Sequence, residues 1–180
     1  MKKSGLVLLT LGSILLGVGA KAQALETTTF DLFAKNSACL SSATGRVTVL
    51  HREETEGVDT LHLNVSGLPG NTDFTVFLTS SDAFTVPPFG AAEYIGDFTT
   101  NAAGVGSLKV DAIIGEAFVS VPTPAGRVRT DLDHLVIWFA DPAQVPACFN
   151  NPAPTPFDGD GVAGTTAMSS QGATGLELFP

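Results

Sequence analysis

Basic residues are scarce in this sequence. Nine Lys and Arg stand against 18 Asp and Glu in 180 residues, so the formal net charge is −9. Three of the nine, Lys2, Lys3 and Lys21, lie near the N-terminus, and a chain without them would carry about −12. An acidic surface of this size repels phosphate backbones and anionic lipids. We therefore expect no nucleic acid among the partners of the protein.

Long hydrophobic runs are also missing, with one exception at the start of the chain. Leu6–Val18 is almost entirely apolar, follows two lysines and precedes small residues at positions 20, 22 and 24. This pattern is typical of a secretory signal peptide. The alternative, a membrane anchor, needs about 20 apolar residues, and this run is shorter. We expect residues 1–24 to form a signal peptide cleaved before Gln23 or Leu25. The protein would then be secreted, extracellular or periplasmic, without a membrane span.

Cysteine is limited to Cys39 and Cys148. Two cysteines 109 positions apart would hold a metal only with histidines beside them. An exported protein meets conditions in which disulfides form and persist. We therefore expect a Cys39–Cys148 disulfide.

Helical periodicity is absent as well. No stretch outside the expected signal peptide keeps a 3.6-residue apolar period for more than two turns, whereas short alternating segments between turn residues predict about eight strands. The expected strands are Thr27–Phe33, Arg46–Arg52, Thr60–Ser66, Asp73–Ser80, Glu93–Thr100, Gly106–Ala112, Ala117–Val121 and Asp133–Ala140, with a final strand or two in Thr165–Ser169 and Leu176–Phe179. We predict an all-β protein, an antiparallel immunoglobulin-like or Greek-key sandwich. Residues 25–180 would form one domain with a Pro/Gly-rich C-terminal segment from about residue 150.

Three segments refine this prediction. Asp133–Ala140 is apolar on both faces, which predicts a central strand with Trp138 buried. Pro122–Thr130 predicts a turn region. Asn64–Leu78 predicts a strand, a corner and a second strand, because Gly67–Asn71 combines glycine, proline and asparagine.

The corner and a later hairpin resemble known β-sandwiches. Leu68, Thr72 and Phe74 resemble the E–F corner of fibronectin type III and related immunoglobulin-like domains, with Phe74 where that corner has a tyrosine. Gly96–Leu108 resembles the Gly-x-Phe-x-Thr-Asp/Asn-x-x-Gly-x-Gly hairpin of bacterial secreted sandwiches, including chordin-like domains. These resemblances imply a β-sandwich and assign no catalytic residue.

The histidines were considered as metal ligands. His51 and His62 lie on adjacent strands of one expected hairpin, and a shared metal needs both on one face. Pairing Val47 with Val65 and Val49 with Leu63 places His51 opposite Leu61 and His62 on the other face. A shared metal would need the pairing of the two strands to shift by one residue, which would expose the apolar side chains of one strand to water. For His134, which follows Asp133, we expect a hydrogen-bonded structural role.

Other patterns were weighed as catalytic or ligand sites. Glu53–Asp59 offers the paired carboxylates of a glycosidase, but we favour the solvated tip of a hairpin. Asp158–Gly161 suits a calcium turn, but we favour a plain Asp-Gly turn. Gly159–Gly164 matches the spacing of a dinucleotide-binding loop, and the prolines before it argue against that function. No nucleophile-elbow motif is present, so we predict no catalytic residue, no metal ligand and no cofactor.

The connection Ser81–Ala91 is the favoured recognition segment. Its Phe84 and Phe89 are the predicted binding residues, since loops at the rim of a rigid scaffold carry function; the alternative is that both cap the core. We predict a secreted binding or structural module without catalytic activity, whose partner is an unidentified extracellular protein or surface ligand. The alternative is an extracellular hydrolase or metal-dependent enzyme on the same scaffold.

Overall fold

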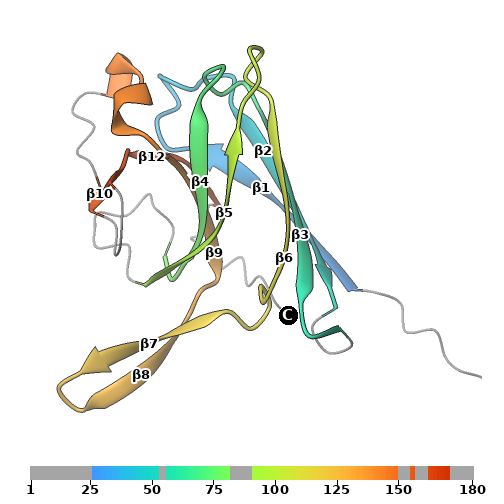
Figure 1. Ribbon diagram of the computed structural model, residues 1–180, viewed down its shortest axis with the longest axis vertical. Helices are drawn as coiled ribbons and strands as arrows, with labels where there is room; N and C mark the ends of the chain where they lie inside the picture. Colours follow the sequence, from blue (N-terminus) through green and yellow to red (C-terminus); the bar gives the residue numbers. More distant parts are fainter. Residues whose placement is uncertain (1–25, 53–55, 82–90, 150–154, 157–161, 171–180) are drawn as a thin grey trace, which may run out of the picture.

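Eight strands form one antiparallel sheet that curls into a nearly closed barrel (Figure 1). The computed structural model describes residues 26–52, 56–81, 91–149, 155–156 and 162–170. The strands of this sheet are β1 (Glu26–Ala34), β2 (Thr44–His51), β3 (Asp59–Ser66), β4 (Asp73–Thr79), β5 (Ala92–Thr99), β6 (Gly106–Ala112), β9 (His134–Phe139) and β12 (Thr166–Ser170). Their order in the sheet is β5-β4-β9-β12-β1-β2-β3-β6. The two end strands, β5 and β6, lie beside each other without a hydrogen-bonded ladder.

The all-β, antiparallel class predicted from the sequence is confirmed. The two separate sheets of a sandwich are not, because a hydrogen-bonded ladder joins every neighbouring pair from β5 round to β6. The smaller elements are two separate ribbons and two short 3-10 turns. They are β7 (Phe118–Thr123) with β8 (Gly126–Asp131), β10 (Thr155–Pro156) with β11 (Val162–Ala163), η1 (Pro142–Gln144) and η2 (Ala147–Phe149).

Alternating apolar residues on the strands fill the inside of the barrel. On β2 and β3, Val47, Val49, Leu61 and Leu63 have no exposed surface, as the two-residue period of a strand with one buried face requires. Strand β9 lies between β12 and β4, and all six of its residues are buried. It is therefore the central strand that the sequence predicts.

Strand β9 buries its two faces against different neighbours. Leu135, Ile137 and Phe139 belong to the main core. The other face carries Trp138, which is 2% exposed, with its ring centroid 4.8 Å from that of Phe77 on β4. The predicted burial of Trp138 is confirmed.

The predicted corner closes one end of the barrel between β3 and β4. Gly67 and Asn71 have positive φ angles of 72° and 53°, a conformation that glycine and asparagine adopt most readily. The Leu68 amide donates to Gly104 O at 3.3 Å, and the Thr100 hydroxyl donates to Pro69 O at 2.6 Å. These bonds attach the corner to the turn between β5 and β6.

The β2–β3 register differs from the sequence expectation by two residues. Val47 pairs with Leu63 and Val49 with Leu61, so His51 lies near Asp59 instead of opposite Leu61. A slip of two residues leaves every side chain on its own face, and apolar alternation therefore cannot distinguish the two registers. His62 still points to the outer face, where it is paired with Thr48.

The turn region predicted over Pro122–Thr130 is also wrong. Residues 118–131 form the ribbon β7–β8, which turns at Pro124 and Ala125 and projects from the barrel (Figure 1). The prediction of a turn gave more weight to two prolines and a glycine than to the strand-like alternation of the flanking residues. Proline is tolerated at a strand edge, and this ribbon is paired only within itself among the described residues.

The expected disulfide is confirmed, and it ties the loop after β1 to η2. The Cα atoms of Cys39 and Cys148 are 5.6 Å apart. None of the described residues belongs to a helix that is long and apolar enough to cross a membrane. Three of the predictions concern residues outside the described part of the chain: the signal peptide (1–24), the turn Asp158–Gly161 and the strand Leu176–Phe179.

Candidate functional site

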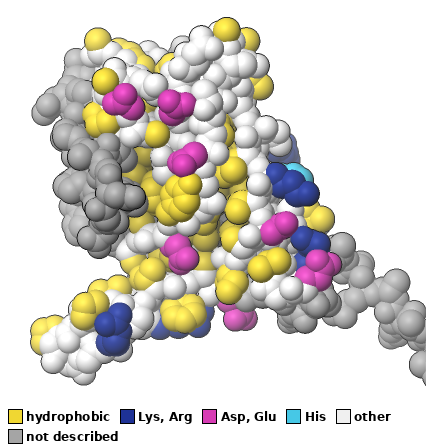
Figure 2. Space-filling model, in the orientation of Figure 1, with side chains coloured by type: hydrophobic (Ala, Val, Ile, Leu, Met, Phe, Trp, Pro, Cys, Tyr) yellow, Lys and Arg dark blue, Asp and Glu magenta, His cyan; other side chains and the backbone are white. Residues whose placement is uncertain are grey.

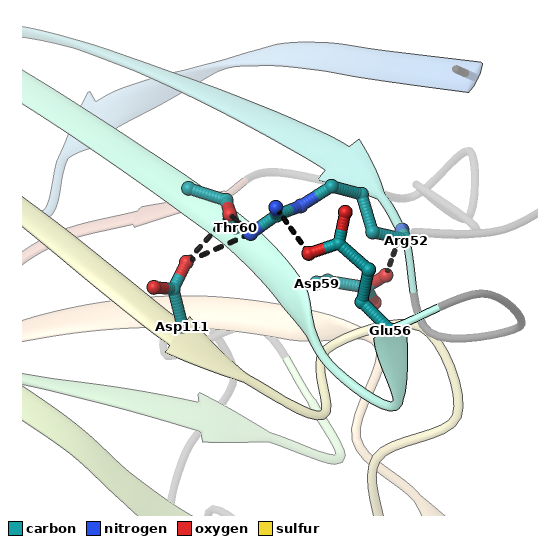
Figure 3. A network of polar contacts seen from close by, with 5 residues as sticks. All are labelled: Arg52, Glu56, Asp59, Thr60 and Asp111. Atoms are coloured by element: carbon teal, nitrogen blue, oxygen red, sulfur yellow. Dashed lines mark hydrogen bonds and ion pairs between the residues drawn. The ribbon is translucent and has the colours of Figure 1, made fainter. Parts of the chain in front are cut away.

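A network of polar side chains lies at the rim of the barrel where β2, β3 and β6 meet (Figure 3). Asp59, only 1% exposed, accepts the Arg52 amide at 2.9 Å and the Gly115 amide at 2.8 Å. One buried carboxylate therefore holds the end of β2 and the segment after β6 against the start of β3. Both bonds are charge-assisted, a strong class of hydrogen bond.

Arg52 extends this network to the outer face. Its guanidinium donates to Glu56 at 2.6 Å, to the Thr60 hydroxyl and to Asp111 at 3.3 Å. Thr60 also donates to Asp111 at 2.5 Å. The pKa of Asp111 lies below its ordinary value, chiefly because of this bond from Thr60, and the charge of Arg52 lowers it further.

The expected acidic hairpin tip is thus partly engaged in ion pairing. Glu56 pairs with Arg52, while residues 53–55 lie outside the described part of the chain. Asp59, grouped with this run in the sequence, is instead a buried structural residue. Nothing in a single sequence distinguishes the buried Asp59 from the solvent-exposed Glu56 three residues earlier.

On the inner face of the same rim, a hydroxyl, an imidazole and a carboxylate follow one another. Thr28 Oγ1 and His51 Nε2 share a hydrogen bond of 2.9 Å. His51 Nδ1 lies 3.9 Å from Asp59 Oδ2, which is too long for a hydrogen bond. The order of groups is that of a catalytic triad, but Asp59 directs its own bonds to the backbone.

The second region of interest is an open groove of about 990 Å³ across β1, β2 and β3, at the other end of these strands. Phe33 lines it and is 44% exposed, and Val105, also exposed, lies on its border. Arg46, Asn64 and Ser66 supply polar groups to the same groove. An aromatic side chain beside hydrogen-bonding groups is the usual composition of a ligand site.

The polar groups of the groove are held by weak contacts with each other. Arg46 and Asp31 form an ion pair of 3.9 Å, and both side chains are more than half exposed. Thr44 and Ser66 share a hydrogen bond of 2.8 Å between their hydroxyls. Exposed pairs of this kind contribute little to stability, so a ligand can replace them at small cost.

The sequence did not identify this groove. Phe33 is expected from the sequence as the end of an ordinary strand, and alternation with the buried Leu32 places it on the outer face. The polar residues beside it come from β2 and β3, which a single strand does not reveal. The predicted binding residues, Phe84 and Phe89, lie outside the described residues. His134 accepts or donates a 2.6 Å bond with Asp133 and is buried, which agrees with the structural role expected for it.

Within the described ranges no three His, Cys, Asp or Glu side chains lie close enough to hold a metal ion together. His51 and His62 point to opposite faces, so the structure does not bring them together.

Comparison with known proteins gives no further identification: no family model, no curated protein and no solved structure matches this chain.

Proposed function

We propose that the protein is a secreted, non-catalytic binding module that holds an extended, uncharged, hydroxyl-rich ligand, such as a glycan chain, in the groove across β1–β3. The observation that carries this proposal is the exposed Phe33 beside Arg46, Asn64 and Ser66 in one open groove. The inner faces of the same strands form the barrel core, so the groove rests on a rigid scaffold.

The chemistry of the groove favours this ligand class. An aromatic ring offers a flat apolar face on which the C–H groups of a sugar can pack, and amide, hydroxyl and guanidinium groups can bond its hydroxyls. The facing charges of Asp31 and Arg46 largely cancel, and Lys35 leaves the lining with a formal charge of only +1, so the groove selects weakly for a charged ligand. The open shape suits a long chain more than a small enclosed molecule.

A retention experiment tests the proposal. The purified protein is incubated with insoluble cellulose, chitin and cross-linked starch, and the bound fraction is measured. We expect retention on at least one of them, reduced at least tenfold in Phe33→Ala, the loss expected for removing one aromatic stacking group, about 1.4 kcal/mol. Phe118→Ala is the matched control, because Phe118 is exposed to a similar extent, 47%, but lies on β7.

Two results would contradict this function. One is the absence of retention on all three polysaccharides. The other is equal loss in Phe33→Ala and Phe118→Ala, which would mean non-specific adsorption through exposed aromatic rings.

Secretion is part of the same proposal. A chain exported through its N-terminal segment should begin at Gln23 or Leu25. Intact-mass measurement of material recovered outside the cells tests this, and a mass that still includes residues 1–22 would be incompatible with it. The disulfide supports the proposal, because disulfides persist in oxidising compartments.

The finer fold proposal is a Greek-key arrangement related to the sandwiches named above. It is supported by the order β3-β6-β5-β4, in which the chain leaves β3, crosses the barrel end and returns through β4, β5 and β6. In a sandwich such strands form two separate sheets, whereas in a nearly closed barrel hydrogen-bonded ladders join them into one.

An extracellular hydrolase is the second candidate function, favoured by the order Thr28, His51 and Asp59 at the rim. In that case Thr28 would be the nucleophile, with His51 as its base. Hydrolysis of p-nitrophenyl acetate tests it. Activity above buffer that Thr28→Val removes and Thr28→Ser keeps would favour the hydrolase, and equal rates in all three proteins would exclude this triad.

A further inference from the structure

The ribbon β7–β8, residues 118–131, is an arm that projects from the barrel, with Val119 near its base packed against the core (Figure 1). Most of its residues are exposed, and both strands pair only with each other in the described part of the chain. A lone two-stranded ribbon is at best marginally stable in water, and a third strand or a packed face is needed to stabilise it. The arm therefore has the properties of an interaction element.

The arm has two chemically different faces. The pairing of Val121 with Val128 and of Val119 with Thr130 places β-branched side chains on one face. The opposite face carries Phe118, Arg127 and Arg129, because successive residues of a strand alternate between faces. The arm is thus amphipathic like a strand of the barrel itself. Its valine face is half-buried at Val119, which packs against the barrel core, and at Val121, and it is exposed at Val128.

The arm is also the basic part of an acidic molecule. Residues 118–131 contain two arginines and one aspartate, a formal charge of +1, in a chain of net charge −9. Arg129 lies over the Phe118 ring at 4.2 Å and pairs with Asp131 at 2.6 Å. Arg127 donates to the Ser120 hydroxyl and carbonyl, and it forms no ion pair with any described carboxylate.

Strand β5 presents a complementary edge. Its ladder with β4 occupies one edge, and from Gly96 onward the other edge is covered by β6, where Leu108 packs against Gly96. Ala92, Glu93 and Tyr94, at the start of β5, are all exposed instead of alternating. This part of the edge is open in the described structure.

Acidic groups lie beside this open edge on the outer face. Asp97 accepts a 2.7 Å bond from the Tyr94 hydroxyl, which raises the pKa of Tyr94, and Asp73 accepts the Thr99 hydroxyl at 2.7 Å. Neither carboxylate forms an ion pair with a described cation. Figure 2 shows acidic side chains on the body of the molecule, and Lys or Arg side chains both on the projecting arm and on the side of the body away from it.

We propose that the arm of one copy of this protein pairs with the open edge of β5 in a second copy. The pairing edge is β8, because β7 carries Pro122, which has no N–H to donate. Added to β5 in this way, the arginine face of the arm adjoins Tyr94 and Asp97. Ile95 and Phe98 of β5 are already buried in the barrel. The arginine face of the arm therefore meets its charge counterpart, and a second copy supplies a third strand beside β8.

A charge-exchange experiment tests this proposal. The full chain is examined by light scattering after size exclusion at micromolar concentration, and we expect a mass of two or more chains. Arg127→Glu/Arg129→Glu places an acidic arm against an acidic edge, and Glu93→Lys/Asp97→Lys places a basic arm against a basic edge. Each variant alone should self-associate at least tenfold more weakly than the parent.

Mixing the two variants gives the decisive result. In the mixture each arm meets an edge of opposite charge, so an assembly containing both chains should form again. It should dissociate in 1 M NaCl, where the screening length is about 3 Å. Matched controls with the same change of charge elsewhere are Arg46→Glu/Lys109→Glu and Glu26→Lys/Asp31→Lys, all at exposed sites. These controls should associate like the parent.

Three outcomes would overturn the proposal: a monomeric parent protein, loss of association in the controls as well, or no assembly in the mixture. Thermal unfolding of each variant verifies that it is folded. If the parent is monomeric but is retained on a polysaccharide through Phe33, the groove function stands and only the arm proposal fails.

Discussion

At the scale of single residues, the rim of the barrel depends on a few buried polar groups. Asp59 joins three segments through two backbone amides, and Thr60 and Arg52 both contact Asp111 on the outer face. Such groups are costly to bury unless their bonds are made. The network therefore makes the hairpin end sensitive to substitution and to pH.

Asp111 should make the stability of the protein depend on acidity. Its pKa in the folded chain lies below the ordinary value of 3.8, so its contribution is complete above that value and is lost as pH falls through the lowered pKa. Asp111→Asn should reduce the decrease in Tm between about pH 4 and 2. Tm measured against pH tests this, and an unchanged acid limb would contradict it. Thr60→Val should move the pKa of Asp111 upward in an NMR titration.

Trp138 should be among the most sensitive residues of the outer layer of β9. It is 2% exposed and lies against Phe77. Trp138→Ala should cost about 3–5 kcal/mol, and Trp138→Phe less, because the second change empties a smaller volume. Denaturant titration measures both. A loss below about 1 kcal/mol for the alanine variant is the size expected of a surface residue and would refute the assignment.

At the scale of elements, the corner between β3 and β4 is positioned by the turn between β5 and β6. Gly70 and Gly104 allow the two backbones to approach where a Cβ would collide with carbonyl oxygens, and Gly67 lies equally close to Ser42 O in the loop between β1 and β2. The sequence predicted the corner from turn chemistry alone. Its contact with residues 100–105 explains why the two resemblance segments are both glycine-rich: they pack on each other.

Gly104 should be the most restrictive glycine of this contact. Its φ is +74°, and a Cβ would lie 2.0 Å from Leu68 O. Gly104→Ala should therefore cost more than Gly57→Ala, which has a φ of +80° but open space around it. The control should lose only the cost of a left-handed alanine, about 1–2 kcal/mol. Equal losses in denaturant titration would show that the corner moves aside.

At the scale of the whole molecule, a strongly acidic chain forms a barrel whose one seam, between β5 and β6, lacks a ladder. Cys39 and Cys148 link two connections far apart in sequence, so the disulfide restrains the unfolded chain over a long loop. The ribbons β7–β8 and β10–β11 are paired only within themselves in the described structure, and β5 and β6 are the two end strands of the large sheet.

Removal of the disulfide should destabilise the protein without changing its fold. Cys39→Ser/Cys148→Ser should lower the free energy of unfolding by about 4–5 kcal/mol, since the closed loop is about 109 residues long. Denaturant titration with and without reductant measures it. The reductant should have the same effect on the parent and none on the variant, and a loss near zero would mean that the unfolded state is already compact.

The local features of this protein were determined by its sequence: the positions of most strands, the central strand with Trp138, the corner and the disulfide partners. The strands and the corner follow from alternation and turn chemistry, which depend on residues close together in the chain. The disulfide follows because two cysteines allow only one pairing. Only the tertiary structure decided which strands meet. It closed one sheet instead of two, slid β2 against β3 by two residues and buried Asp59. Each of these depends on contacts between residues far apart in the chain, such as Thr60 with Asp111, for which no local pattern exists.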